Sequence, residues 1–248
     1  MKTEKLEYCY HTHTTRCGHA LGKEEEYIKQ AIKCGIKRIG FADHVFLPTI
    51  VQDGMRGRYS ELGDYVNTLR ELKEAYKDKI DLKIGFECEF YPSFVYYYKD
   101  LLNSKTVDYL ILGQHLHESI NGIEGYHYRS DTYAEDVVNG IKSGLFTYLC
   151  HPDLCMLWSK WNANTENDFR KIFKACEETH TPIEINVGGL RGNREYPCDE
   201  AFELSKHYNL EYVIGIDAHR PEDFNKKDIN KAFRFAKKHK LKIKDLVI

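Results

Sequence analysis

Three histidines lie within nine residues near the start of the chain, in the stretch YCYHTHTTRCGHA, at positions 11, 13 and 19. His11 and His13 are two residues apart, so on a β-strand their side chains would point to the same side and could bind one cation. Asp217 and His219 repeat this spacing near the end of the chain. Imidazole and carboxylate ligands together suit zinc, manganese or iron. The spacing therefore favours a transition-metal site over a set of isolated histidines.

Residues of the same chemical kind follow apolar, β-type runs throughout the sequence. Glu87 ends one run, and its two oxygens could bridge two metal ions. We interpret Glu89 as a residue that orients a ligand from behind. The remaining strand-end candidates are Asp43, His44, Gln114, His115, His117, His151, Asp153, Asn186, Arg191 and Arg220.

The elements that must position these residues alternate regularly. Seven β-type runs are predicted at 6–10, 37–42, 81–87, 107–113, 144–150, 181–186 and 210–216. Helical segments are predicted at 23–33, 60–76, 93–102, 133–142, 164–178, 199–207 and 221–239. Such repeats imply parallel strands joined by crossover helices, in either an open sheet or a closed barrel. No glycine-rich nucleotide motif follows any run.

In a parallel barrel all strand carboxyl ends open on one face. The candidates listed above would then meet in one cleft, although they come from the whole chain. The guanidinium groups of Arg191 and Arg220 suit phosphate oxygens. Arg16 and Arg194 are weaker candidates for the same role. We expect His127, His180, His207 and His239, which follow no such run, at the surface or in loops.

Composition excludes several other classes of protein. The chain has 248 residues, 42% of them hydrophobic, and a net charge of −2. This predicts a single globular domain, residues 1–248, with a small-molecule partner and neither a nucleic acid nor a membrane. The first residues contain no apolar signal segment, and no run is long enough to span a bilayer. We therefore expect a cytoplasmic protein whose eight cysteines are mostly buried, reduced thiols.

Taken in order, the blocks YHTHT…CGHA, GFADH, GFECEF, GQH, CHPD, EINVGGLR and GIDAHR resemble the polymerase-and-histidinol-phosphatase (PHP) superfamily. Within it the chain is most similar to the monofunctional histidinol-phosphate phosphatases, over nearly its full length. The resemblance implies an α/β fold, a distorted (β/α)7 TIM-like barrel with its metal site at the carboxyl ends of the strands. It also implies hydrolysis of L-histidinol phosphate, a step of histidine biosynthesis.

Carried over by motif, the resemblance implies a trinuclear metal centre. The first ion would be held by His11, His13, Glu87 and Asp217, the second by Glu87, His115 and His151, and the third by His19, His44 and His219. Arg191 and Arg220 would bind phosphate, with Asp217 as a third catalytic residue and Asp43 beside a ligand. Gln114 departs from the small residue usual at this place in the family. We take Gln114 and His117 as candidates for substrate contact.

Two rival functions remain open from sequence. The same metal set could serve another phosphoesterase, such as a protein-tyrosine phosphatase, a nucleotide phosphodiesterase or a sugar-phosphate phosphatase. A non-enzymatic, polymerase-associated module is the second rival. It is disfavoured because a complete ligand set has no purely structural purpose.

Overall fold

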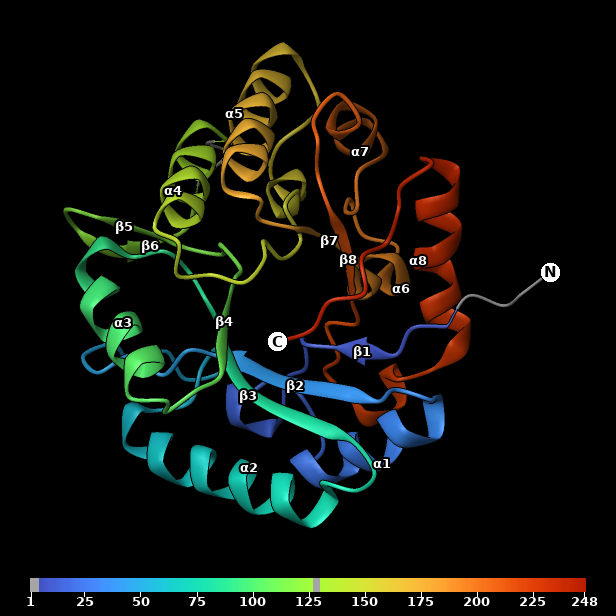
Figure 1. Cartoon of the computed structure of the whole chain (residues 1–248). Coiled ribbons are helices and arrows are strands. Elements are labelled where there is room, and N and C mark those ends of the chain that lie inside the picture. Colours follow the sequence, from blue (N-terminus) through green and yellow to red (C-terminus); the bar gives the residue numbers. More distant parts are fainter. Residues whose placement is uncertain (1–4, 127–129) are drawn as a thin grey trace.

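Parallel strands curl into a ring in the computed structural model, which describes residues 5–126 and 130–248 (Figure 1). One sheet contains β1 (Tyr8–Cys9), β2 (Arg38–His44), β3 (Asp81–Cys88) and β4 (Tyr109–Leu112), paired in that order. A second pair contains β7 (Ile183–Asn186) and β8 (Tyr212–Gly215). All these pairings are parallel, as the alternating pattern predicts.

Single bridges close the ring. Leu149 bridges Leu112, the last residue of β4, on one side and Ile183 of β7 on the other, and Thr12 bridges Ala218 beyond β8. The fold is thus the predicted TIM-like α/β barrel. The predicted strand at 144–150 is wrong as a regular element, because this segment contributes only the bridge at Leu149.

Helices surround the strands on the outside (Figure 1). They are α1 (Glu24–Cys34), α2 (Leu62–Tyr76), α3 (Val95–Asn103), α4 (Ser130–Lys142), α5 (Ala163–Thr179), α6 (Val187–Gly192), α7 (Asp199–Ser205) and α8 (Lys226–Lys238). Short 3₁₀ turns are η1 (Thr15–Cys17), η2 (Tyr59–Glu61), η3 (Pro92–Phe94), η4 (Leu154–Leu157) and η5 (Pro221–Asp223). Six of the predicted helical segments are confirmed with small shifts at their ends. The segment predicted at 221–239 is divided into η5 and α8, and α6 was not predicted.

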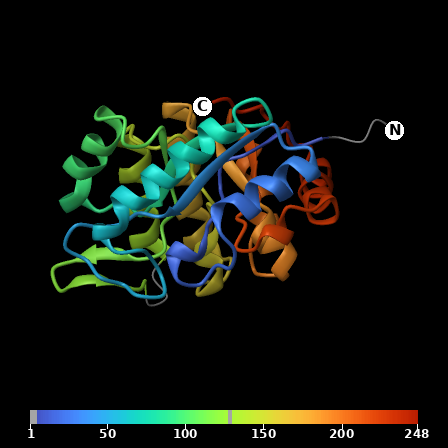
Figure 2. The same ribbon diagram turned by 90° about the horizontal axis from the view of Figure 1, so that it is seen from below.

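A small antiparallel hairpin, β5 (His117–Ser119) with β6 (Gly122–Glu124), was also not predicted. Seen from below, the hairpin lies at the lower edge of the molecule and the C-terminus lies at the upper edge (Figure 2). The chain leaves the barrel after β4 and enters the hairpin at His117, so His115 and His117 do not share a strand.

Two glycines make room for acids inside the barrel. A Cβ at Gly113 would overlap the carboxylate of Glu87, and a Cβ at Gly215 would overlap the carboxylate of Glu184. Each glycine sits at or just past the end of a strand next to the acid's own strand. Close approach of buried carboxylates therefore depends on the absence of a side chain at these positions.

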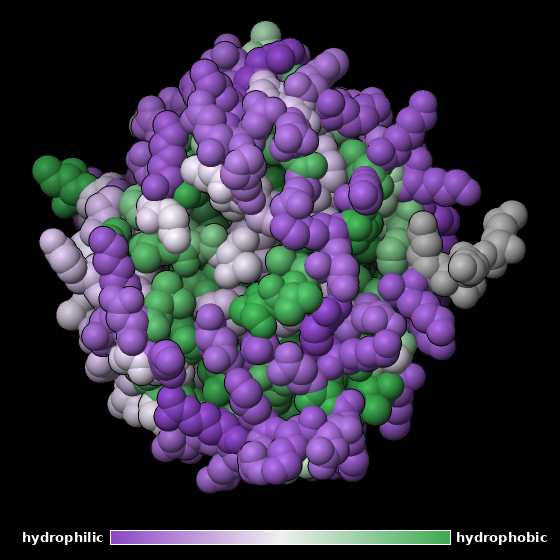
Figure 3. All heavy atoms as spheres, in the orientation of Figure 1, coloured by the Kyte–Doolittle hydropathy of each residue, from purple (hydrophilic) through white to green (hydrophobic). Residues whose placement is uncertain are grey.

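The surface in the orientation of Figure 1 is largely hydrophilic, with hydrophobic residues gathered near its centre (Figure 3). No helix among the described residues is both long and apolar enough to cross a bilayer. All eight cysteines are free thiols, seven of them buried and Cys34 half-buried, which confirms the prediction for their state.

Candidate metal centre

A cleft of about 560 Å³ opens where the strands end. Its walls contain side chains from most of the strand-end blocks. The described lining residues are His13, His19, His44, Met55, Glu87, His115, His151, Leu154, Leu157, Trp158, Gly188, Arg191, Arg194, Tyr196, Asp217, His219 and Arg220. The structure thus confirms the prediction that these segments meet on one face of the barrel.

Glu87, at the end of β3, is the centre of the cluster. The shortest distances from a Glu87 oxygen to a ring nitrogen are 2.8 Å for His151, 3.3 Å for His13 and for His44, 3.5 Å for His11 and 3.6 Å for His115. Both oxygens of the carboxylate take part. Glu87 therefore has the position of a bridging ligand.

Asp217 approaches the same Nε2 atoms of His11 and His13 as Glu87 does. Its Oδ1 lies 3.6 Å from Nε2 of His11 and of His13, and 3.3 Å from Nδ1 of His219. The backbone of Asp217 has φ of 51°, and that of His151 has φ of 23°. Left-handed backbone at non-glycine residues is uncommon and costs free energy. Its occurrence at two candidate ligands agrees with a site for which local backbone strain is tolerated.

Contacts within the cluster keep its two carboxylates, Glu87 and Asp217, ionised. Burial alone would raise the pKa of Glu87, but the nearby imidazoles, first His115 and then His11 and His44, hold this pKa well below its usual range. Burial likewise opposes ionisation of Asp217, yet its imidazole neighbours, beginning with His11, keep its pKa well below normal. Burial lowers the pKa of His44 well below its usual value. Ionised carboxylates beside a neutral imidazole are the forms that bind cations.

Several ring nitrogens of these histidines have no hydrogen-bond partner among the described residues. Nε2 of His11, both ring nitrogens of His13, Nδ1 of His44 and Nδ1 of His151 are buried without a hydrogen-bond partner. Buried polar atoms are normally paired. Several groups of three side chains have ligand atoms within 4.8 Å of one another, among them His11 with His13 and Asp217. The donor set and its unpaired atoms therefore fit divalent transition-metal ions.

His19 lies at the open side of the cleft. Its Nε2 is 3.0 Å from Nε2 of His219, and its Nδ1 contacts the carbonyl oxygens of Cys17 and Gly54, each at 3.1 Å. His44 groups with His13 and His219, and its ring centroid lies 5.5 Å from that of His19. All nine predicted ligands thus belong to one cluster, while the division of ligands among individual ions stays a prediction.

Glu184 on β7 is a site residue that the sequence reasoning missed. Its Oε1 lies 2.8 Å from Nδ1 of His11, and its Oε2 accepts from the backbone N–H of His151 and the side-chain amide of Asn186, at 3.0 and 2.8 Å. Burial lowers the pKa of His11, but Glu184 and then Asp217 raise it well above the usual range. Glu184 therefore fixes the ring of one ligand and the backbone of another. Glu184 could have been found from the sequence, because it lies two residues before the candidate Asn186 and so on the same face of the strand.

Arg191 and Arg220 both line the cleft. Nη2 of Arg191 lies 3.1 Å from the carboxylate of Asp223 and 3.2 Å from the backbone oxygen of Asp217. Its Nη1 is buried without a partner, so a donor remains for an anion. The Arg220 side chain is exposed at the rim. Arg194 also reaches the cleft, where Nη1 donates to the Tyr196 hydroxyl at 3.0 Å.

The structure does not bring Gln114 and His117 into the cleft lining. Gln114 is fully buried, its Oε1 accepting from the N–H of Phe90 at 2.7 Å and its Nε2 donating to the carbonyl of Leu116 at 2.8 Å. His117 stacks on Tyr126 with 5.2 Å between ring centroids. Both side chains contact residues of, or next to, the segment after β4, and their contact with a substrate stays a prediction.

Other predicted neighbours have defined places. Glu89 contacts Nδ1 of His115 at 3.2 Å, as expected of a residue that orients a ligand. Asp43 accepts from the N–H and hydroxyl of Thr14 at 2.7 and 2.8 Å, which holds the loop after His13. Asp153 is buried and accepts from the N–H of Cys198 outside the cleft lining, and burial raises its pKa to about 7.

Of the remaining predictions, Arg16 forms ion pairs with Glu24 and Asp64, at 2.5 and 2.6 Å, and lies outside the cleft lining. The histidines at 180 and 207 are exposed as expected. His239, predicted at the surface or in a loop, lies in the turn after α8, but its ring is buried between Glu203 and Asp199. His127 lies outside the described residues.

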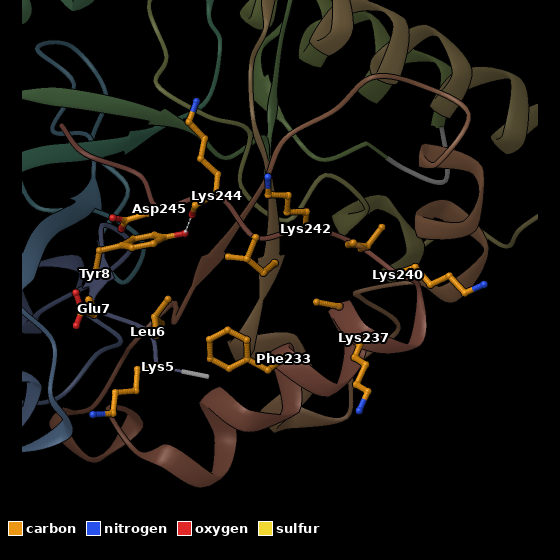
Figure 4. Close-up of a pocket in the computed structure, with 13 residues that line it drawn as sticks. Lys5, Leu6, Glu7, Tyr8, Phe233, Lys237, Lys240, Lys242, Lys244 and Asp245 are labelled. Carbon is orange, nitrogen blue, oxygen red and sulfur yellow. Dashed lines mark hydrogen bonds between the residues drawn. The ribbon is translucent and has the colours of Figure 1, made fainter. Parts of the chain in front are cut away.

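A second cavity, of about 760 Å³, lies between β1, α8 and the segment 240–245 (Figure 4). Lysines surround its apolar floor, which includes Phe233 and Leu6. The described part of its lining contains no histidine, and the two acids there, Glu7 and Asp245, pair with basic residues outside the cavity. It is therefore the smaller, histidine-lined cleft that has the chemistry of a reaction site.

The fold and the cleft together define an α/β-barrel enzyme with candidate metal ligands at the carboxyl ends of its strands. The model of the PHP domain matches residues 10–188, and the chain belongs to this family. A probable histidinol-phosphatase of Deinococcus radiodurans is 24% identical over 239 residues, covering 91% of this chain and 88% of the relative. The histidinol-phosphatase of Bacillus subtilis is 23% identical, covering 86% and 93%.

Solved structures show the same fold. The histidinol phosphate phosphatase of Lactococcus lactis, solved in complex with zinc, L-histidinol and phosphate, matches with a TM-score of 0.74 at 19% identity, over 96% of this chain and 95% of that one. The metal-dependent tyrosine phosphatases of Bacillus subtilis and Streptococcus pneumoniae match with a TM-score of 0.57 at 14% identity, over 93% and 86%.

Proposed function

We propose that this chain is a metal-dependent phosphomonoesterase that hydrolyses L-histidinol phosphate to L-histidinol and phosphate in histidine biosynthesis. The observation that carries the proposal is the cluster of five imidazoles around Glu87 beside an arginine with a free donor. Near full-length similarity to histidinol-phosphatases supports this particular substrate.

Three divalent ions, zinc, manganese or iron, complete the proposed site, with the ligands divided as the family motifs imply. Bound there, divalent ions would neutralise charge on the phosphate and lower the pKa of the water that attacks phosphorus. The chain itself holds the ligand rings in place through Glu184 and Glu89. Preorganised ligands of this kind cost little reorganisation during reaction.

The phosphoryl group would lie against Arg191, whose Nη1 is free to donate to an equatorial oxygen. Asp223 keeps the guanidinium in place. Arg220 at the rim supplies a second cation. The departing alcohol needs a proton. The carboxylate of Asp217 is ionised, so water in the cleft beside Asp217 and His219, which lie 3.3 Å apart, would supply this proton.

The proposal includes a single domain over residues 1–248 and a cytoplasmic location, in agreement with eight unpaired cysteines. The partner is a small phosphate ester rather than a nucleic acid. A cleft of about 560 Å³ is of the size that takes a small metabolite.

The test is phosphate release from L-histidinol phosphate by purified, metal-analysed protein, beside p-nitrophenyl phosphate, a phosphotyrosine peptide, AMP and fructose 1-phosphate. We expect histidinol phosphate to exceed every other ester in kcat/KM by orders of magnitude, and chelation to abolish the activity. A clear preference for the phosphotyrosine peptide would instead place the chain with the tyrosine phosphatases. Protein without bound metal that stays inactive after zinc or manganese is added would contradict the metal centre itself.

A further inference from the structure

The cleft has an apolar wall beside its metal ligands. Leu154, Leu157 and Trp158 line it, and all three come from η4 and the residue after it. This segment begins three residues after His151, so the wall is tied closely to a candidate ligand. Leu157 is 46% exposed. An apolar surface left open beside a charged cluster indicates that part of a ligand covers it.

Trp158 is held in one orientation by an aromatic stack. The ring of Tyr126 lies parallel to the indole, at 5.6 Å between centroids and an interplanar angle of 5°, and Tyr133 meets it edge-on at 6.0 Å. The Tyr126 hydroxyl donates to Asp136 at 2.9 Å, and the Tyr133 hydroxyl donates to the carbonyl of Pro152 at 3.0 Å. His117, on the hairpin, stacks behind Tyr126. The indole is therefore positioned before a ligand binds.

The surface that Trp158 offers to the cleft is the carbon face of its ring. Its Nε1 is buried and has no hydrogen-bond partner among the described residues, so this N–H is not the group presented to a ligand. Tyr126 covers one face of the ring. A flat π-surface favours stacked rings and cations over its face.

The charges in the cleft also indicate that the indole face binds a ring or a cation of the ligand. Glu87 and Asp217 are the two acids among the described lining residues. Both are already surrounded by imidazoles. No carboxylate of the described lining is left to pair with an ammonium or a protonated ring of the substrate. An aromatic face is the remaining described group that attracts such a cation.

We propose that Trp158, with Leu154 and Leu157, forms the subsite for the leaving alcohol and selects alcohols that carry a flat, weakly basic ring. In L-histidinol phosphate the imidazole would stack on the indole while the phosphoryl group lies against Arg191 and the metal ligands. This inference rests on the proposed function and adds a specificity-determining residue to it. It also gives the hairpin a role, since His117 supports the stack from behind.

The test compares W158L and W158F with W161L. Trp161 is the other tryptophan of the chain, stacks on Phe169 at 5.4 Å and lies outside the cleft lining, so W161L is a matched control. The first measurement is the ratio of kcat/KM for L-histidinol phosphate to kcat/KM for ethanolamine phosphate, which keeps the amine but has no ring. We expect this ratio to fall at least about tenfold in W158L, less in W158F, and not in W161L.

The second measurement is equilibrium binding of L-histidinol and of L-alaninol to the metal-loaded protein by calorimetry. L-Alaninol keeps the amino alcohol and lacks the imidazole. We expect the wild-type protein to prefer L-histidinol, and W158L to lose that preference with unchanged metal content and circular dichroism. A preference that is absent in the wild type, or that survives in W158L, would overturn the inference. If histidinol phosphate is not hydrolysed but the preference is lost only in the Trp158 variants, the proposed function fails while the subsite stands.

Discussion

Arg56 and Glu89 form an ion pair inside the protein, with 3.1 Å between Nη2 and Oε2 and neither side chain exposed. Glu89 uses its other oxygen to contact Nδ1 of His115. Arg56 also donates to the carbonyl of Val45 at 3.0 Å and to Oε1 of Gln52 at 2.6 Å. Burial alone would raise the pKa of Glu89, but Arg56 and then His115 hold it below its usual value. One guanidinium thus connects two strand ends and a loop behind the candidate ligands.

Replacing this arginine should destabilise the protein strongly. In R56A the Glu89 carboxylate would remain buried without its cation, and loss of one partner of a buried pair costs about 3–5 kcal/mol of unfolding free energy. Chemical denaturation followed by circular dichroism measures this change. R58A is the control, because Arg58 pairs with Asp53 on the surface, with both side chains largely exposed. Equal stability of R56A and wild type would show that the pair contributes nothing.

Glu184 provides a prediction for metal binding. In E184Q the amide replaces a charged acceptor beside Nδ1 of His11, so the ring loses the partner that fixes its orientation. We expect the affinity for zinc to fall about 10–100-fold. Competition with a chromogenic chelator measures it. E178Q, at an exposed position of α5, should bind zinc like the wild type, and an unchanged affinity in E184Q would assign Glu184 to folding alone.

The positions of the ligands could be predicted because they depend on local rules. Residues at strand ends meet on one face of a parallel barrel, and residues two apart on a strand share a side. These rules place His11, His13 and Glu87 correctly without any distance information. They need only the order of the elements, which the alternation of apolar and helical segments supplies.

Other features depend on contacts that no local rule contains. Glu184 meets His11 across 173 positions of sequence, and Arg56 comes from a loop without a periodic pattern. Gln114 follows β4 in the expected place, but its side chain turns to the backbone of Phe90. His239 is buried because α7 provides two carboxylates for its ring. In each case the partner, rather than the residue's own neighbours in sequence, determines the outcome.

Arg191 leads to a kinetic prediction. Its Nη1 is the buried donor without a partner beside the metal ligands, so R191Q should lose a contact to the phosphoryl group that strengthens as charge develops. Removing one donor of this kind lowers the rate by about 100-fold or more. We expect kcat/KM for any accepted phosphomonoester to fall by this factor while zinc content stays constant. R234Q, exposed on α8, is the matched control, and comparable kinetics in both variants would exclude phosphate binding by Arg191.

The raised pKa of Asp136 lets us predict how the free energy of unfolding depends on pH. Burial raises its pKa to about 6, against the opposing effects of the Tyr126 hydroxyl and His117. In the unfolded chain a carboxyl group of this type titrates near 3.9. Between pH 4 and 6 the folded state therefore holds a proton that the unfolded state has lost, and the contribution of Asp136 to stability falls as pH rises. Above pH 6 the carboxylate is ionised in both states, and its full unfavourable effect is present.

The variant D136N removes this unfavourable charge but keeps an oxygen that accepts from Tyr126. A shift of two units corresponds to about 3 kcal/mol, and partial exposure of Asp136 reduces this to about 1–2 kcal/mol. D136N should therefore be more stable than the wild type by this amount at pH 8, and the two should converge below pH 4. Urea denaturation at a series of pH values measures the difference. D100N, changed at an exposed position of α3, should show no such dependence, and a constant difference for D136N across the series would contradict the assignment.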